Sequence, residues 1–292
     1  MKTALFTKLF QGHTVDAISR HAIELGFDAI DLLVRNGFQV APEEPDSIFP
    51  AVAVLEEAGL SVPMATTDLT DPAWHGAERL LWSCAQSGIG LVRLGYWAYD
   101  YSAGYASQLE SARRDLHGLA GLAEATGIRL ALQLHGDTLH GSGAQAIALL
   151  QEHDPRFLSA YPDPGNQVVQ DGREDWRFTF DVLRPWLSCV GVKNGGWFAS
   201  NIDSSGQRRW WADWLGVADG MVPWDEILDF LAQDEFDGIL SFHSHYEAPF
   251  DQVLEQTRAD LRYVERLLGS SPIATVEDSA VAELTVKGGS SP

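Results

Sequence analysis

Alternating apolar and polar residues mark several short strands along the chain. In the stretch 128–137, three leucines alternate with Ala131, Gln133 and His135. Side chains on a strand switch faces at every residue, so one face is apolar and the other carries polar groups near the strand's end. The same pattern recurs at 158–163, 189–194 and 239–245. We interpret these stretches as strands that deliver polar side chains to one shared pocket.

Helical patterns separate these strands from one another. A first helix is predicted after Thr14, a favoured N-cap residue, and it ends at Gly26. Further strands are predicted at 1–11, 29–35, 60–66 and 91–95. Further helices are predicted at 48–58, 72–87, 106–126, 143–153, 174–186, 222–233 and 250–268. Eight strand–helix pairs predict an α/β protein, a single-domain (β/α)8 TIM barrel over residues 1–268.

Two segments do not follow the strand–helix alternation. The connection 195–222 is longer than a usual βα loop and contains Trp210, Trp211 and Trp214. We expect this Trp-rich loop after strand 7 to cover the barrel mouth as a lid or to pack against a second subunit, which would make the protein a homo-oligomer. Residues 269–292 are rich in Ser, Pro, Gly and Ala without a periodic face, which predicts a disordered tail.

Charge and composition narrow the classes of partner. The net charge of −21 and the pI near 4.6 disfavour nucleic acid and anionic membranes, which both need a positive protein surface. No leader-like or membrane-spanning apolar run is present, so we expect a soluble, cytoplasmic protein. Cys84 and Cys189 lack the spacing of a disulfide framework or a zinc site, and we expect buried, reduced thiols.

Polar residues gather at the predicted C-terminal ends of the strands, where βα barrels build their active sites. These residues are Arg35, Asp68, Arg93, Gln133, His135, Asp163, Asn166, Lys193, His243 and His245. They include metal ligands, cations and amide donors. Four consecutive strands that each end in such a group favour a functional pocket over unrelated polar residues at strand ends.

Three of these residues carry the most specific chemistry. Asp163 lies between two prolines, and a rigid backbone that holds a carboxylate suits a divalent ion, although a turn-capping Asp is the alternative. Lys193 suits contact with an oxyanion or a substrate hydroxyl, or it is a rim lysine. His243 shares one strand face with His245, and both are candidates for acid or base, or else partly buried histidines bonded to backbone or water.

The chain resembles the xylose isomerase-like family of TIM barrels over about residues 1–268. The segments that carry the resemblance are 26–31, 130–135, 163–166, 192–194 and 236–243. The resemblance implies a sugar isomerase or epimerase with one divalent metal, often Mn²⁺ or Mg²⁺. In that family the metal is held by Glu, Asp, His and Glu from the fifth to eighth strands, and the two glutamates also move the substrate's proton.

The chain departs from this ligand set at three of four places. Only Asp163 is kept, while the other positions are Gln133, Gly191 and His243. Two nearby residues also differ, since Asn166 and Asn194 replace the usual His and Asp. Glutamine cannot accept a proton, so a relay between two carboxylates is not available. A set with one negative charge suits Mn²⁺, Co²⁺, Fe²⁺ or Zn²⁺ better than Mg²⁺, and Mn²⁺ is the first choice.

These observations together predict a metal-assisted isomerase or epimerase acting on a sugar, keto-sugar or polyol at the barrel mouth. The expected metal ligands are Gln133, Asp163 and His243, with His135 or His245 completing the shell. The expected catalytic residues are Lys193, His243 and His245. The expected substrate-binding residues are Arg35, Arg93, His135, Asn166 and Trp197. Two alternatives stay open: a lyase or glycoside-cleaving enzyme acting on a keto-sugar, and a non-catalytic sugar-binding barrel.

Overall fold

The strands form a closed parallel barrel in the computed structural model, which describes residues 1–170 and 174–269. The barrel strands are β1 (Lys2–Phe6), β2 (Ala29–Leu33), β3 (Ser61–Thr66), β4 (Leu91–Arg93), β5 (Arg129–Gln133), β6 (Leu158–Tyr161), β7 (Cys189–Val192) and β10 (Ile239–Phe242). Their order is β6-β5-β4-β3-β2-β1-β10-β7. The ends meet where Ser188 N donates to Ala160 O at 3.2 Å and Gly191 N donates to Pro162 O at 2.9 Å. The predicted TIM barrel is therefore confirmed.

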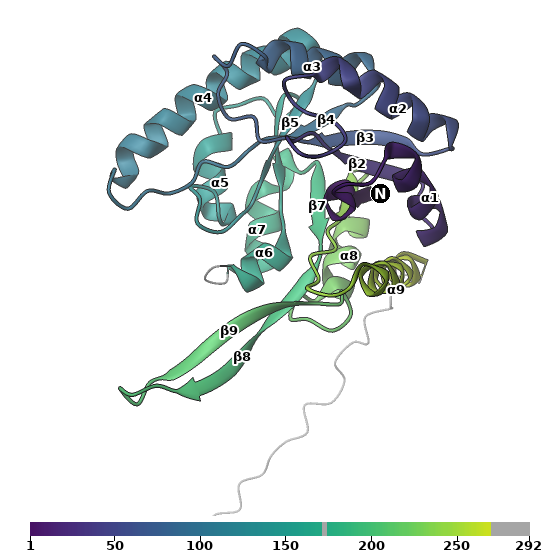
Figure 1. The fold of residues 1–292 in the computed structure, drawn as a ribbon. Coiled ribbons are helices and arrows are strands. Elements are labelled where there is room, and N and C mark those ends of the chain that lie inside the picture. Colours follow the sequence, from purple (N-terminus) through teal and green to yellow (C-terminus); the bar gives the residue numbers. More distant parts are fainter. Residues whose placement is uncertain (171–173, 270–292) are drawn as a thin grey trace, which may run out of the picture.

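Helices surround the barrel (Figure 1). They are α1 (Val15–Leu25), α2 (Ile48–Glu57), α3 (Ala77–Gln86), α4 (Tyr105–Thr126), α5 (Gly143–Leu150), α6 (Pro164–Val169), α7 (Trp176–Leu183), α8 (Trp224–Gln233) and α9 (Phe250–Gly269). The Thr14 side chain accepts a hydrogen bond from Ala17 N, and Gly26 ends α1 at a φ of 103°, as predicted. Helix α3 begins five residues later than expected, and the one-and-a-half-turn α6 was not predicted.

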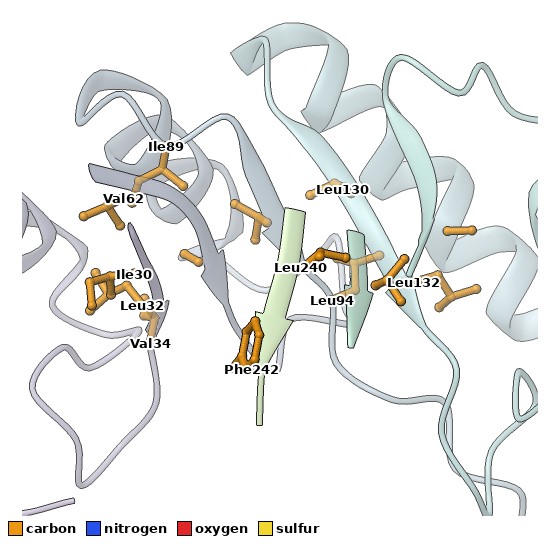
Figure 2. Close-up of a cluster of buried hydrophobic side chains, with 14 of the residues drawn as sticks. Ile30, Leu32, Val34, Val62, Ile89, Leu94, Leu130, Leu132, Leu240 and Phe242 are labelled. Carbon is orange, nitrogen blue, oxygen red and sulfur yellow. The ribbon is translucent and has the colours of Figure 1, made fainter. Parts of the chain in front are cut away.

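Strand alternation divides the buried side chains into two sets. The outward-facing leucines Leu130, Leu132 and Leu240 pack between the barrel and the helices (Figure 2). A separate inner cluster contains Ala4, Ala29, Met64, Leu91, Ala131, Tyr161, Cys189 and Ile239. In five strands the next inward residue toward the C-terminal end is polar and buried, namely Asp31, Thr66, Arg93, Gln133 and Ser241. The barrel interior thus changes from apolar to polar as it approaches the mouth.

The Trp-rich connection is an antiparallel hairpin of β8 (Asn194–Ile202) and β9 (Arg208–Leu215). The hairpin projects away from the barrel (Figure 1), and 58% of Trp210 and 48% of Trp211 are exposed. Only its base reaches the mouth, where the Trp214 ring lies 4.6 Å from Lys193 Nζ. The connection is therefore more ordered than a loop, and its outer part projects away from the residues that the structure describes. Its packing against a second subunit stays a prediction.

Three further predictions concern the C-terminal tail, the two cysteines and membrane-spanning helices. Gly269 is the last residue of α9, and the remainder of the predicted disordered tail, 270–292, lies outside the described residues. Cys84 and Cys189 are both buried and free, as expected. Within the part of the chain that the structure describes, no helix combines the length and apolarity needed to cross a bilayer.

Candidate active site at the carboxyl ends of the strands

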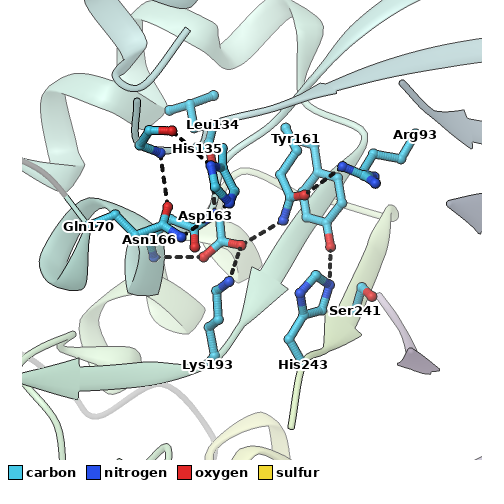
Figure 3. Close-up of polar contacts among 12 residues, drawn as sticks. Arg93, Leu134, His135, Tyr161, Asp163, Asn166, Gln170, Lys193, Ser241 and His243 are labelled. Atoms are coloured by element: carbon cyan, nitrogen blue, oxygen red, sulfur yellow. Dashed lines mark hydrogen bonds and ion pairs between the residues drawn. The ribbon is translucent and has the colours of Figure 1, made fainter. Parts of the chain in front are cut away.

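Asp163 is the centre of a buried polar network at the barrel mouth (Figure 3). It follows β6 directly and caps α6, because its Oδ1 accepts a hydrogen bond from Asn166 N at 2.9 Å. Its Oδ2 accepts a hydrogen bond from Gln133 Nε2 at 2.7 Å and lies 3.2 Å from Lys193 Nζ. Asp163 is fully buried and Lys193 is 3% exposed. The carboxylate is therefore both a helix cap and one half of an enclosed ion pair.

Gln133 connects this ion pair to a buried arginine. Its Oε1 accepts hydrogen bonds from the Tyr96 hydroxyl at 2.8 Å and from Arg93 Nη1 at 3.5 Å. Arg93 is 2% exposed, and its Nη2 donates to Thr67 O at 2.9 Å and lies 3.6 Å from Asp68 Oδ1. The Arg93 guanidinium carbon also lies 4.6 Å from the centre of the Tyr96 ring. Two buried cations thus face this side of the mouth.

A cavity of about 380 Å³ opens beside Arg93, at the ends of β2 and β3. Arg35 crosses it to form a two-point ion pair with Asp68, with an Nε–Oδ2 distance of 2.5 Å. Trp74 forms part of the wall. The pKa of Lys8 nearby is lowered by burial and then by the charges of Arg35 and Arg93. Three cations, Arg35, Arg93 and Lys8, thus lie close together at this part of the mouth, and the cavity is also lined by the carboxylates of Glu43, Asp68 and Asp71.

Two histidines follow β10, the strand that pairs with β7. His243 Nε2 lies 2.7 Å from the Tyr161 hydroxyl, and the His243 ring is 5.5 Å from the His245 ring. Burial, and after it the charge of Lys193, holds the pKa of both histidines well below the usual value. Trp214 contacts the His245 ring at 5.6 Å. Both imidazoles are therefore neutral at physiological pH.

The three remaining predicted substrate-binding residues are His135, Asn166 and Trp197. His135 stacks on Tyr96 at 4.2 Å between ring centres, and its Nε2 lies 3.1 Å from Gln170 Nε2. Asn166 Nδ2 donates to Leu134 O at 2.8 Å, while Asn166 Oδ1 is enclosed without a partner in the described chain. Trp197 lies on β8, where its indole N–H donates to a backbone oxygen of α6. The tryptophan that contacts Lys193 is instead Trp214.

Sequence reasoning missed four residues of the mouth: Asp31, Tyr96, Tyr161 and Trp214. A signal existed for two of them. Tyr161 precedes Asp163 by two residues, and Asp31 follows the inward-facing Ala29 by two residues, so strand alternation places both inside the barrel. Tyr96 follows a strand end in a loop, and Trp214 returns on a hairpin, so alternation along the barrel strands could not place them.

Comparison with known proteins gives a family match. The family model described as Xylose isomerase-like TIM barrel matches residues 19–267. The chain belongs to the xylose isomerase-like TIM barrel family. Comparison with curated protein sequences gives no match.

Solved structures of this family superimpose over most of the chain. A xylose isomerase-like TIM barrel protein from Mycobacterium smegmatis in complex with magnesium has a TM-score of 0.70 and 18% identity, covering 91% of this chain and 97% of that one. The 3-keto-D-glucoside 4-epimerase of E. coli has a TM-score of 0.67 and 15% identity, covering 91% and 99%. An L-ribulose 3-epimerase has a TM-score of 0.68 and 13% identity, covering 92% and 95%. At these identities the likeness shows the fold alone.

The residues at the mouth do not fit the divalent metal that the xylose isomerase-like family implies. Both oxygens of Asp163 already accept donors, Gln133 Oε1 accepts two, and His243 Nε2 is bonded to Tyr161. The Lys193 ammonium would repel a second cation at the same carboxylate oxygen. In residues 1–170 and 174–269, no group of three or more His, Cys, Asp or Glu is placed to hold a metal.

Gly191 is a further reason why the mouth does not fit the metal site of the family. It occupies the position at which the family resemblance implies a metal-binding histidine. A Cβ atom at this position would lie 2.6 Å from Asp163 Oδ2, which is closer than real Cβ contacts allow. The Asp163 carboxylate therefore fills the space through which a side chain at position 191 would have to extend.

Proposed function

We propose that this protein is a carbohydrate isomerase or epimerase that moves a proton on a carbon next to a carbonyl group. The observation that carries the proposal is the buried Lys193–Asp163 pair at the mouth, with the neutral imidazoles of His243 and His245 at the end of the neighbouring strand. Two family neighbours that are sugar epimerases support the substrate class. Trp74 in the cavity wall offers an aromatic face of the kind that stacks on sugar rings.

Each group supplies one requirement of enolisation. A neutral histidine, His243 or His245, accepts the proton from carbon, and the electron pair of the broken C–H bond moves into the substrate as an enolate. Lys193 donates a hydrogen bond to the enolate oxygen, where negative charge develops. Return of the proton to the opposite face of the same carbon gives an epimer. Its transfer to the former carbonyl carbon gives an isomer, when the proton of the neighbouring hydroxyl moves to the enolate oxygen and that hydroxyl oxygen becomes the new carbonyl.

In the proposed reaction, four of the predicted binding residues contact the substrate. Arg35 lines the cavity, Arg93 contacts Thr67 of its wall, and His135 and Asn166 lie toward α6. The unpartnered Asn166 Oδ1 is an acceptor for a sugar hydroxyl, because a buried carbonyl oxygen without a donor is unfavourable. We retain these four residues as substrate contacts in the proposal.

Lys193 takes the electrostatic role that the sequence assigned to Mn²⁺ at Gln133, Asp163 and His243. Its ammonium group lies 3.2 Å from the one carboxylate of that set. We therefore expect dialysis against EDTA to leave the turnover rate unchanged and added Mn²⁺ to have no effect. A loss of activity in EDTA that Mn²⁺ restores would return this role to a metal.

Solvent exchange tests the proposed reaction. The protein is incubated in D₂O with a panel of aldoses, ketoses and 3-keto-glycosides, and NMR follows deuterium on the carbon next to the carbonyl and the appearance of a new isomer. His243→Gln should reduce exchange at least about 100-fold, because general base catalysis contributes about 10²–10⁴. His117→Gln, the same substitution on the exposed surface of α4, is the matched control. Exchange with no member of the panel would refute the proposal.

A lyase acting on a keto-sugar is the second candidate, and the single carboxylate of the mouth favours it. With Gln133 in place of a glutamate, no second carboxylate returns the proton, and an enolate that is not reprotonated can expel a neighbouring oxygen. The same NMR experiment separates the two reactions. Release of a second product, with no new epimer, would replace isomerisation with elimination, and binding without exchange would indicate a sugar-binding barrel.

A further inference from the structure

One face of the projecting hairpin carries three tryptophans at successive positions. Residues opposite each other in the antiparallel pair of β8 and β9 share a face, and every second pair returns to the same face. On one face, three successive pairs each join a tryptophan to a small residue: Gly195–Trp214, Trp197–Ala212 and Ala199–Trp210. Each indole ring therefore has no large side chain directly opposite it on the neighbouring strand. We call the surface formed by Trp214, Trp197 and Trp210 the tryptophan face.

The inner end of the tryptophan face lies at the barrel mouth. The centre of the Trp214 ring is 4.6 Å from Lys193 Nζ and 5.6 Å from the centre of the His245 ring. Trp197 follows on the same face, and its indole N–H donates to the backbone oxygen of Val168 in α6. The face is therefore continuous with the candidate active site and runs outward along the hairpin that Figure 1 shows.

The outer end of the tryptophan face is open to solvent. The exposed fraction is 40% for Trp197 and 58% for Trp210, and within residues 1–170 and 174–269 neither ring packs on another aromatic ring or on a cation. The opposite face of the hairpin differs, because there the Trp211 ring lies 5.0 Å from the Phe198 ring. Leaving large apolar rings in water is unfavourable, and exposed patches of this kind mark binding surfaces.

The length of the tryptophan face suits a ligand longer than one sugar. Trp214 and Trp210 are four residues apart on β9, so their Cα atoms are separated by roughly 14 Å. A single sugar held beside Trp214 is too short to reach Trp210, whereas further units linked to that sugar can reach it. The face therefore matches a ligand that begins in the mouth and extends along the hairpin.

The area and charge of this surface favour a small neutral ligand over a second copy of the chain. The exposed parts of Trp197 and Trp210 amount to roughly 200 Å², taking about 200 Å² for one whole aromatic side chain. A stable protein interface buries about 800 Å² on each partner. A second copy would also carry the same net charge of −21, and this repulsion opposes association.

The chemistry of the hairpin matches that of a sugar ring. A pyranose presents an apolar face of C–H groups surrounded by hydroxyl groups, so it packs on a flat aromatic ring and needs hydrogen-bonding groups nearby. Between Ala199 and Trp210 the hairpin has five uncharged hydrogen-bonding side chains: Ser200, Asn201, Ser204, Ser205 and Gln207. Aromatic rings and polar groups thus lie on the same short segment.

We propose that the tryptophan face binds the outer units of an oligosaccharide whose reacting sugar lies in the mouth. The inference rests on the proposed function, because it extends the substrate from a free sugar to a sugar linked to further units. Trp214 lies beside the reacting unit, and Trp197 and Trp210 stack on the units that follow it.

Calorimetric titration tests this binding without requiring turnover. The probes are gluco-, xylo- and manno-oligosaccharides of one to four units. For at least one series, the affinity should rise from the monosaccharide to the trisaccharide, and Trp210→Ala should reduce this gain about tenfold. Trp210→Tyr keeps an aromatic face and should retain most of the gain. An affinity that does not rise with chain length in any of the three series would overturn the inference.

Trp211→Ala is the matched control for Trp210→Ala. Trp211 is the next residue on the same strand, 48% of it is exposed, and it lies on the opposite face of the hairpin. Its loss should leave the dependence of affinity on chain length unchanged. If both variants lose the gain equally, the effect comes from the general fold of the hairpin and the inference fails.

Two further measurements separate this inference from its alternatives. Sedimentation shows whether the face holds a second subunit: an oligomer that Trp210→Ala converts to a monomer, with sugar affinity independent of chain length, would overturn the inference. Deuterium exchange in D₂O tests the reaction separately. Exchange on free sugars without any effect of chain length would keep the proposed reaction and refute the inference. Trisaccharide binding that depends on Trp210, without exchange, would keep the tryptophan face and refute the reaction.

Discussion

Two neighbouring parts of the barrel mouth bury polar side chains in different ways. At the ends of β4 to β7 the buried side chains are charged and paired. Lys193 contacts Asp163, and Arg93 contacts oxygens of Gln133 and Thr67. At the end of β10, charge is avoided, and His243 stays neutral with its Nε2 bonded to the Tyr161 hydroxyl. A buried cation can stabilise an oxyanion, while a neutral imidazole can accept a proton. In the proposed reaction, the first group supplies electrostatic stabilisation and the second accepts the proton.

Breaking the ion pair should give the largest effect. Lys193→Met leaves the Asp163 carboxylate buried without its cation, which typically costs about 3–5 kcal/mol of unfolding free energy. Activity should fall at least about 1000-fold, since the oxyanion donor is lost as well. Urea unfolding and an exchange assay measure the two quantities.

The neutral double variant Asp163→Asn with Lys193→Met separates these two effects. Because no unpaired charge remains, it should regain most of the lost stability while staying inactive. If the double variant is as unstable as Lys193→Met alone, the pair contributes through packing and not through charge.

The buried carboxyl group of Asp31 should make the free energy of unfolding depend on pH. Burial raises the pKa of Asp31 from 3.8 to about 6, so the folded state binds the proton more tightly than the unfolded state does. Stability is therefore highest at low pH with respect to this group and falls as pH rises between about 4 and 6. The difference corresponds to about 3 kcal/mol.

Asp31→Asn tests this dependence, because the amide cannot ionise. In this variant the loss of unfolding free energy that comes from ionising Asp31 should be absent. Its unfolding free energy relative to wild type should therefore increase from pH 4 to pH 8. Chemical denaturation across that range measures the change, with Asp46→Asn at an exposed ion pair as the control. A difference between Asp31→Asn and wild type that does not change with pH would show that Asp31 is not perturbed.

Removing a neutral hydrogen bond near Arg93 should have a moderate effect. Tyr96→Phe deletes the 2.8 Å hydrogen bond to Gln133 Oε1 and leaves the ring over Arg93 in place. We expect a loss of about 1 kcal/mol in stability and of about tenfold in kcat, with little change in KM. Tyr99→Phe is a control on the same loop. A change in KM alone would place Tyr96 among substrate contacts.

The projecting hairpin should matter least to the barrel. Trp210→Ser with Trp211→Ser should change the unfolding free energy by less than about 0.5 kcal/mol, because both rings are about half exposed and lie beyond the mouth. Sedimentation of the same variant tests the predicted second subunit. A wild-type oligomer that becomes a monomer in the variant would establish the hairpin as the interface, and a monomeric wild type would rule out the homo-oligomer.

The alternation of apolar and polar residues predicted the barrel strands well, because this pattern depends only on residues that are close together in the sequence. The three leucines at 130, 132 and 134 face outward, and Gln133 faces inward, as their spacing requires. Asp163, Lys193 and His243 likewise reach one mouth. Alternation does not tell which inward groups become partners, because that depends on strands far apart in sequence.

The hydrogen bond between Ser241 and Asp31 illustrates this limit. Ser241 and Asp31 are separated by 210 residues, and their contact exists only because β1 lies between β2 and β10. The metal site predicted from the family pattern illustrates it as well, since the same three residues bond to Lys193, Tyr96 and Tyr161. The spacing of residues along the strands identified the polar groups at the mouth. Their hydrogen-bond and ion-pair partners depend on how the strands come together in the barrel.

Gly191 limits how this mouth could be redesigned. A histidine introduced at this position alone would collide with the Asp163 carboxylate, which fills the adjacent space. A designer who wanted a histidine ligand here would therefore have to move or replace Asp163 in the same step.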